Sequence, residues 1–324
     1  MTKSMGATVE VSKISIGAAR NFWKATTSSA LIILALLINL FFSDEIAHSV
    51  RSGLMLCANV IIPSVFPFII LSDFLLHSIN FSSLRPLGYL FRKTFNINSA
   101  ALPAFLLGLL CGFPLGVRCA VSLYEDGRIS REECERLIGF SNNTGPAFLI
   151  SGIGLGLRGN VIEGVILYVS MTLSALICGF VFGFGRKCSE DSGDIIQKYP
   201  FSLTDSIKNA GLNTLNICSY LTFFALFCGL LKKALGVSLP YLLLIPFLEV
   251  GSAASILSKA TLLPPAVSLA LTSLAVGFSG FCVHMQAMSF IRPARLGCKK
   301  YFCMKLFQGA ISFSLTTAFI YLFL

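Results

Sequence analysis

The chain has 324 residues, of which 55% are hydrophobic and 12% are charged, and its formal net charge is +10. A soluble globular protein carries about twice this share of charged residues, and a soluble chain with so few charges would expose large apolar patches. The basic residues are spread over several short loops, which fits the inner loops of a membrane protein and argues against a nucleic-acid-binding face. We therefore expect an all-α polytopic membrane protein with no nucleic-acid partner.

The eleven cysteines indicate neither a disulfide framework nor a metal site. Most of them lie inside apolar runs, no C-x-x-C pair occurs, and the three histidines are not clustered. Cysteine in such runs behaves as a small buried apolar side chain. We expect free buried thiols, and no metal or cofactor.

Residues 1–45 are predicted to form a basic N-terminus followed by the first membrane span, at 28–43. Basic residues precede Ala30, and an apolar run continues to Phe42 without a small-residue cleavage site after it. This pattern predicts an uncleaved span rather than a signal peptide. The N-terminus is expected inside and Asp44 outside, because basic residues favour the inner side.

Residues 46–187 are predicted to form a first repeat unit. Its expected elements are a segment at 46–60 that lies at the interface or enters obliquely, and a span at 61–79 that Pro63 and Pro67 break or tilt. A re-entrant hairpin at 99–124, an outward crossing at 137–157 and a return span at 161–185 are expected to follow. A charged turn follows the hairpin, and there Ser130 and Glu133 match the S-x-x-E capping box that begins a helix.

A hydrophilic linker at 188–204 separates this unit from a second one at 205–324. The second unit is expected to contain segments at 206–231, 237–257, 262–291 and 301–324. The first unit begins outside and ends inside, whereas the second begins inside and ends outside. The two units are thus predicted to be inverted repeats, an architecture common in secondary carriers.

Glycine, proline and polar residues interrupt the apolar segments of the first unit at two places. The residues that we predict to bind substrate there are Gly112, Pro114, Gly116, Arg118, Ser141, Asn142, Asn143 and Thr144. Non-helical backbone at membrane depth occurs only where it is buried or lines a cavity, and paired interruptions point to a transporter's binding site.

The chemistry expected at these interruptions favours a small anion. A broken helix presents free N–H groups and a partial positive charge at its new N-terminus, which suits carboxylates. Arg118 adds a guanidinium that can bind a carboxylate bidentately. Two alternatives stay open: Arg118 extends to the inner interface or pairs with Glu125, and the Asn142–Asn143 pair serves helix–helix hydrogen bonding.

In the second unit we predict that Glu249, His284 and Gln286 complete the site or couple it to an ion, H⁺ or Na⁺. Glu249 lies in an interruption at membrane depth, where a carboxylate is a functional candidate by default. The alternatives are that Glu249 pairs with Lys259 or binds backbone N–H groups, and that His284 is packed and hydrogen-bonded.

Enzyme signatures are absent from the sequence. It contains no H-E-x-x-H, G-x-S-x-G or P-loop motif, and Ser141 has no paired base nearby in the sequence. These motifs would place a zinc ligand set, a nucleophile or a phosphate cradle. We expect that the protein is not an enzyme.

Ordered motifs along residues 49–292 resemble those of the YlbJ-type sporulation integral membrane proteins, of the nucleoside-recognition, or Gate, domain class. The motifs are Cys-Gly-Phe-Pro-Leu-Gly-Val-Arg at 111–118, Leu-Tyr-Glu at 123–125, Ile-Ser-Arg-Glu-Glu at 129–133, Phe-Ser-Asn-Asn-Thr-Gly-Pro at 140–146, Leu-Glu-Val-Gly at 248–251 and Gly-Phe-Ser-Gly-Phe-Cys-Val-His-Met-Gln at 277–286. The chain departs from the pattern of many relatives at Phe113 and Arg118, where we expect Tyr and Lys, and at 250–252, where Thr-Asn-Gly is common.

The resemblance implies a role in endospore formation and a Gate architecture like that of concentrative nucleoside carriers. The family is similar to a stage V sporulation protein thought to move dipicolinic acid from the mother cell across the outer forespore membrane. Dipicolinate is an aromatic dicarboxylate, which agrees with the anion-directed chemistry of the interruptions. We therefore expect a dipicolinate exporter in the outer forespore membrane, with a nucleoside-like or other organic-anion carrier and a non-transporting spore-assembly scaffold as the alternatives.

Overall fold

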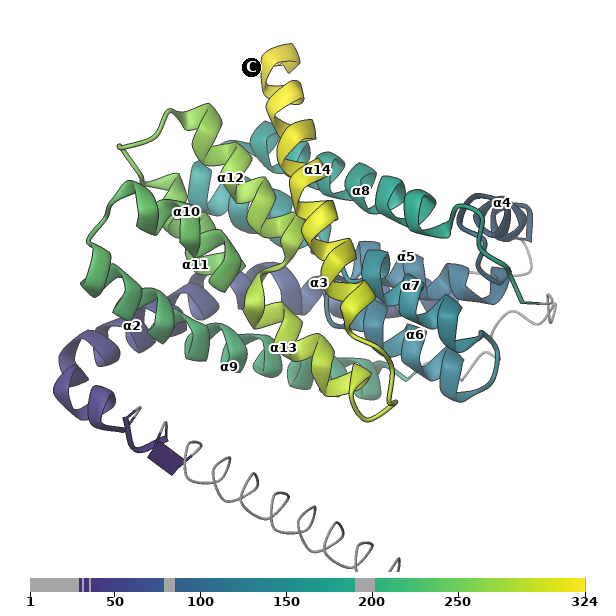
Figure 1. The fold of residues 1–324 in the computed structure, drawn as a ribbon, viewed down its shortest axis with the longest axis horizontal. Coiled ribbons are helices and arrows are strands. Elements are labelled where there is room, and N and C mark those ends of the chain that lie inside the picture. Colours follow the sequence, from purple (N-terminus) through teal and green to yellow (C-terminus); the bar gives the residue numbers. More distant parts are fainter. Residues whose placement is uncertain (1–28, 31, 35, 79–84, 190–201, 324) are drawn as a thin grey trace, which may run out of the picture. The chain divides into compact units, whose positions relative to one another are not determined.

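The structure is a computed structural model that describes residues 29–323 except 31, 35, 79–84 and 190–201 (Figure 1). The predicted basic N-terminus and most of the predicted linker at 188–204 lie outside the described residues. The chain divides into two units, Met1–His48 and Ser49–Leu324. Within the described residues every regular element is helical, so the predicted all-α class is confirmed.

The unit Met1–His48 contains the apolar helix Ile32–Phe41 and the beginning of α2 (Ser43–Leu56). The helix falls within the span predicted at 28–43. Its leucine and isoleucine side chains are largely exposed, as expected for residues that face lipid rather than a protein core.

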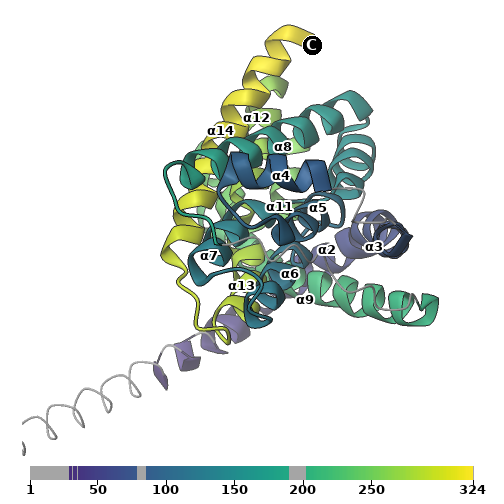
Figure 2. The same cartoon turned by 90° about the vertical axis from the view of Figure 1, so that its right-hand side faces the viewer.

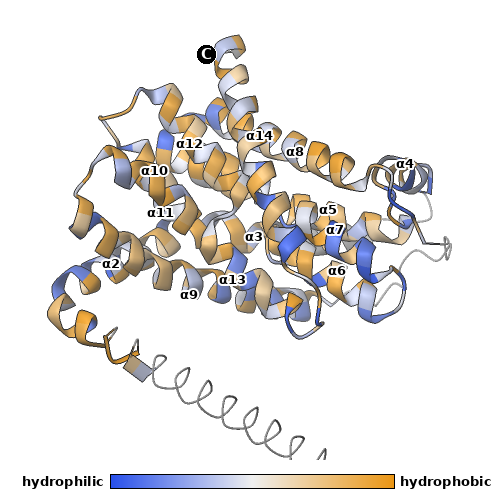
Figure 3. Cartoon of the chain, in the orientation of Figure 1, coloured by the Kyte–Doolittle hydropathy of each residue, from blue (hydrophilic) through white to orange (hydrophobic). Residues whose placement is uncertain are grey.

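Five helical segments of the described chain are long and apolar enough to cross a membrane. They are Ser43–Leu71, Val161–Gly183, Leu203–Leu235, Pro265–Ile291 and Lys299–Leu322. A span needs about 20 apolar residues, and the last four segments coincide with predicted spans. Figure 3 shows hydrophobic colour along most of the helices and hydrophilic colour at the turn between α6 and α7. The chain is therefore a multi-pass integral membrane protein.

The first candidate span includes the segment at 46–60, for which we expected either an interfacial position or an oblique entry. The chain continues as helix through a π-helical turn, η1 (Cys57–Ile61), into α3 (Ile62–Ser78). Pro63 lacks an N–H and its ring would clash with the carbonyl of residue 59 in a regular α-helix. The wider π turn lies directly before this proline. Here the prolines that we expected to break or tilt the helix changed its geometry without ending it.

Two interrupted segments follow in the first half of the unit Ser49–Leu324 (Figures 1 and 2). After α4 (Arg85–Phe95) and a short 3₁₀ turn, α5 (Leu102–Leu110) and α6 (Leu115–Glu125) pack against each other as a hairpin broken at 111–114. A broken crossing comes next, formed by α7 (Arg131–Ser141), a non-helical stretch at 142–145 and the π-helix η4 (Ala147–Leu157). Helix α8 (Val161–Gly183) follows it.

The second half repeats this order of elements. The long helix α9 (Leu203–Leu235) precedes a broken pair, α10 (Leu239–Leu248) and α11 (Val250–Ser258), separated by the extended residue Glu249. A second broken pair, α12 (Pro265–Phe278) and α13 (Gly280–Ile291), is interrupted at the left-handed residue Ser279. The last span is α14 (Lys299–Phe323).

The contacts between the two halves occur in matching pairs. When a helix packs on a helix of the other half, their counterparts also pack on each other. Helix α6 packs on α13, and its counterpart α11 packs on η4; α7 packs on α14, and its counterpart α12 packs on α8. The remaining pairs, α3 with α9 and α8 with α14, join counterparts directly. This is the contact pattern that two related repeats require. Their inversion and the Gate architecture stay predictions.

The charged turn between α6 and α7 is mostly exposed, but Glu133 on the first turn of α7 is buried and binds several backbone groups. The predicted capping box is present: Glu133 N–H donates to Ser130 Oγ, and Ser130 N–H donates to the Glu133 carboxylate at 2.8 Å. The same carboxylate accepts from the N–H groups of Asn98 (2.9 Å) and Ser189 (3.0 Å). Burial alone would raise the pKa of Glu133, but the hydrogen bonds from Ser130 and Ser189 outweigh it and hold the pKa below its usual value.

Candidate functional site

The helix interruptions of the two halves meet around one cavity of about 40 Å³. The stretch 111–113 comes from the α5–α6 break and the residues 144, 145, 147 and 148 from the α7–η4 break, while 249 and 250 come from the α10–α11 break and 282, 283 and 286 from the first turns of α13. Apolar side chains of α3 and α9 close the cavity. A cavity of this size has room for roughly three water molecules, so it is too small for an organic solute.

Four of the predicted substrate-binding residues line this cavity. They are Gly112, Thr144, Glu249 and Gln286. The other seven do not line it: Pro114, Gly116, Arg118, Ser141, Asn142, Asn143 and His284. Two residues from each half thus come together as predicted, although they are far apart in the sequence.

Glycine at positions 112 and 116 permits the close contact between the two breaks of the first half. Gly112 has φ +80°, and a Cβ there would lie 2.8 Å from the nitrogen of Gly145. A Cβ on Gly116 would lie 2.1 Å from the carbonyl oxygen of Ser141. Gly116 and Ser141 therefore contribute through backbone packing, and Gly112 contributes backbone to the cavity wall.

Arg118 lies on an exposed face of α6, away from the cavity. Position 118 falls one helical turn beyond Pro114, at the start of α6, and the residues of this turn that face the protein are Gly116 and Val117. The structure therefore does not bring the Arg118 guanidinium to the other predicted ligands, and its role in binding stays a prediction.

Glu249 is the acidic residue in the cavity wall, and its side chain is only 3% exposed. Its carboxylate accepts hydrogen bonds from the backbone N–H groups of Gly251, at 2.7 Å, and Ser252. A carboxylate at this position satisfies two of the free N–H groups of α11 and interacts favourably with the helix dipole. The alternative that Glu249 binds backbone donors is therefore present in the structure, together with its place in the cavity wall.

Two polar side-chain atoms of the cavity wall lack a hydrogen-bond partner among the described residues. Thr144 Oγ1 and Gln286 Oε1 are both unpaired, although the two residues are 1% and 3% exposed. A buried polar atom without a partner costs about 1–3 kcal/mol. A molecule in the cavity that bonds to these atoms would recover that free energy.

His284 belongs to a second polar cluster behind the α7–η4 break, as the packed alternative predicted. Its Nδ1 lies 3.0 Å from the Tyr301 hydroxyl, which also accepts from Asn142 Nδ2 at 2.8 Å. The histidine ring contacts Phe278 edge-on at 4.6 Å between centroids. The imidazole is therefore held one residue layer away from the cavity.

Sequence reasoning missed Lys305, a fully buried residue of α14. Its ammonium nitrogen donates to the backbone carbonyl of Asn142 and to Gln308 Oε1, the latter at 2.8 Å. Gln308 Nε2 in turn donates to Asn143 Oδ1 at 2.8 Å. The available signal was a lysine inside the apolar span 301–324, with polar residues at 301, 308, 312 and 316 on the same helical face.

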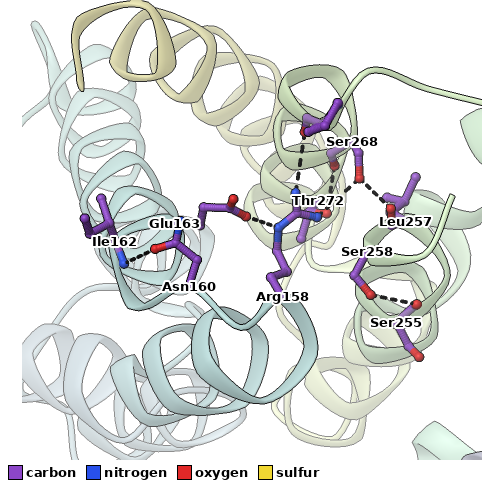
Figure 4. Close-up of polar contacts among 10 residues, drawn as sticks. Arg158, Asn160, Ile162, Glu163, Ser255, Leu257, Ser258, Ser268 and Thr272 are labelled. Carbon is purple, nitrogen blue, oxygen red and sulfur yellow. Dashed lines mark hydrogen bonds and ion pairs between the residues drawn. The ribbon is translucent and has the colours of Figure 1, made fainter. Parts of the chain in front are cut away.

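A third polar cluster joins the end of η4 to the beginning of α12 (Figure 4). Arg158 forms an ion pair with Glu163 and also donates to Ser268 Oγ at 3.2 Å and to the carbonyl of Pro265 at 3.4 Å. One guanidinium thus ties the first half to the second.

The comparison with known proteins agrees with the ordered motifs. The chain is 26% identical over 306 residues to the sporulation integral membrane protein YlbJ of Bacillus subtilis (strain 168), in a match that covers 80% of this chain and 74% of the relative. No protein-family profile matches the chain, and no solved structure matches it. The similarity to YlbJ supports the family that the motifs indicated.

Proposed function

We propose that this chain, a multi-pass membrane protein of the YlbJ type, is a secondary carrier that acts in sporulation and moves a small organic anion. The observation that carries the proposal is the meeting of helix interruptions from both halves around one cavity. Non-helical backbone at membrane depth is retained where it lines a binding site. We expect dipicolinate as the substrate, exported by the mother cell across the outer forespore membrane.

The chemistry of the cavity supports an aromatic solute with polar ends. Most of its wall is apolar, with Phe68, Phe113 and Phe148 among the lining residues, and such walls stack on aromatic rings. Helix η4 begins at the cavity, so its N-terminus adds partial positive charge that favours carboxylates, whereas the N-terminus of α11 is already capped by Glu249. Thr144 and Gln286 supply the unpaired polar atoms that fix orientation.

Transport on this proposal is alternating access around the closed cavity. Drug-sized solutes need a site of roughly 300 Å³ or more, so the broken hairpins α5–α6 and α10–α11 must move apart to admit one. The hairpins are short, and each contacts a helix of the other half at the breaks. Opening one side while the other stays packed would expose the same polar atoms alternately to the two water phases.

A nucleoside-like carrier is the second candidate, favoured by a specific feature of the lining. No lysine or arginine lies among the residues of the cavity wall, whereas a carboxylate, an amide and a hydroxyl do. The carboxylate accepts hydrogen bonds from hydroxyls and ring N–H groups of neutral solutes but not from anions, whereas the amide and the hydroxyl can bind both. A scaffold without transport activity would not need unpaired polar atoms in a cavity at this depth, nor does any part of the proposal require an enzyme.

Uptake by liposomes tests the proposal and separates its two candidates. Purified protein is reconstituted, and uptake of labelled dipicolinate and of labelled uridine is compared with that of empty vesicles. The matched variants are Gln286→Leu, in the cavity wall, and Met285→Leu, whose side chain is exposed on the same helix. We expect dipicolinate uptake by the wild type and Met285→Leu, and a loss of at least tenfold in Gln286→Leu. Uptake equal to that of empty vesicles would refute the carrier, and uptake of uridine alone would favour the second candidate.

A further inference from the structure

A cation is buried in the last span next to the α7–η4 break. Lys305 is 0% exposed, and among the described residues no carboxylate forms an ion pair with it. Isolated charges at membrane depth are costly, and they persist where they move ions or bind substrate. The position of Lys305 therefore calls for a functional explanation.

The hydrogen bonds of Lys305 match a neutral amine better than an ammonium group. Nζ has two acceptors, the carbonyl of Asn142 and Gln308 Oε1. A neutral amine has two N–H donors and one lone pair, whereas an ammonium has three donors. The described surroundings thus provide acceptors for both N–H groups of the neutral form, whose lone pair has no donor among them, and leave one N–H of the charged form without an acceptor.

The other ionisable groups around Lys305 do not neutralise it. Helix α8 presents the thiol of Cys178, which donates to the carbonyl of Met304 at 3.4 Å, and α13 presents His284, bonded to Tyr301. Helix α12 contains no ionisable side chain. Of the acidic residues of α7, Glu132 is exposed, Glu133 binds Ser189 and Ser130, and Glu135 binds Lys300, Arg131 and the N–H of Gly297.

The contacts of Lys305 lead directly to the cavity wall. It binds the carbonyl of Asn142, and through Gln308 it reaches the side chain of Asn143. Thr144, the next residue of this non-helical stretch, lines the cavity with its unpaired hydroxyl. A change in the number of N–H donors on Lys305 would therefore alter the hydrogen bonds that hold the cavity wall.

We propose that Lys305 is the proton-binding site of the carrier and that it couples solute movement to a proton. When the site is open to water, the lone pair of Nζ takes a proton from a hydronium ion, which leaves a water molecule, and the amine becomes ammonium. Loss of that proton to water on the other side restores the amine. This inference rests on the proposed function, and it assigns the proton rather than Na⁺ as the coupling ion. Lys305 acts on the solute through the break and is a positioning residue.

The protonation of Lys305 can be measured without any solute. The protein is labelled with ¹⁵N at the lysine side chains and placed in lipid nanodiscs, and the resonance missing from Lys305→Met identifies Lys305. We expect this resonance to change from ammonium to amine between about pH 5 and about pH 9, a range in which ordinary lysines stay charged. A single protonation state across the whole range would overturn the inference, whether or not the protein transports dipicolinate.

Transport then tests the coupling itself. In liposomes that take up labelled dipicolinate, an imposed pH gradient should accelerate wild-type uptake at least fivefold and should leave Lys305→Gln unaffected. Lys305→Arg, which keeps the charge but cannot release its proton, should also lose the response to the gradient. The control is Lys300→Gln, on the exposed first turn of α14. A gradient response retained by both Lys305 variants would overturn the inference while leaving the carrier intact.

Discussion

The breaks of the two halves line the same cavity, but different parts of the chain hold them. The break at 142–146 is held by side chains of the last span, Lys305, Gln308 and Tyr301, which reach it from more than 150 residues away. The break at 249 is held by its own side chain, which caps the helix that follows. The difference teaches that one break depends on long-range tertiary packing and the other on local chain geometry.

Substitution of the tightly packed glycines at the breaks should have the largest effect on stability. Gly116→Ala places a methyl group 2.1 Å from the Ser141 carbonyl, so the α5–α6 hairpin must separate from α7, at a cost of about 3 kcal/mol or more. In the second half, Gly280→Ala at the start of α13 meets the Leu248 carbonyl at 3.1 Å with φ +59° and should cost about 1–2 kcal/mol.

The measurement is the apparent melting temperature of each variant in detergent, with Gly211→Ala as the control. Position 211 lies in α9 with nothing within 4 Å of an added Cβ, so alanine there should leave the melting temperature unchanged or raise it slightly. If Gly116→Ala melts like Gly211→Ala, the described contact between the two breaks is wrong.

Removal of the hydrogen bonds from α14 to the break at 142–145 should destabilise the protein more than removal of the Glu249 cap. Gln308→Leu leaves Asn143 Oδ1 and one N–H of Lys305 unpaired in the protein interior, which we expect to cost about 2–4 kcal/mol. Glu249→Ala removes a helix cap at a cost of about 1–2 kcal/mol. Urea or thermal unfolding of the two variants gives the order, and equal losses would contradict the distinction between the breaks.

Substitution in the cavity wall should affect transport more than stability. Glu249 lines the cavity and Gln308 does not, so Glu249→Gln, which keeps the side-chain shape, should lower solute uptake at least tenfold with little change in stability. Met285→Leu serves again as the exposed control. Normal uptake by Glu249→Gln would place the solute elsewhere.

The smallest expected effect is a dependence of stability on pH that arises from Glu133 in the first half. The pKa of Glu133 is below its usual value, so its ionised form adds stability above the ordinary carboxyl pKa, and this stability is lost as the pH falls through the lowered value. The melting temperature of the wild type should therefore fall on acidification below about pH 4, and that of Glu133→Gln should fall less. If the melting temperatures of the wild type and Glu133→Gln fell equally on acidification, ionised Glu133 would contribute nothing to the stability.

The same comparison explains how much of the site could be predicted from the sequence. Glu249 was predicted because it lies between a proline and a glycine in an apolar run, so its environment is visible locally. The role of Lys305 depends on α14 packing against α7, which no local pattern records. The spans and the capping box at Ser130 were likewise local and could be predicted, whereas the side of α6 that carries Arg118 depended on the contact of Gly116 with Ser141.

Protection of cysteines by solute tests the central claim, that the breaks meet at the solute site, most directly. Cys282 lines the cavity and Cys303 is exposed on α14, so mass spectrometry can follow the modification of both thiols in one protein. During turnover, saturating dipicolinate should slow the modification of Cys282 several-fold and leave that of Cys303 unchanged. Equal rates with and without solute, in protein that transports dipicolinate, would contradict the account.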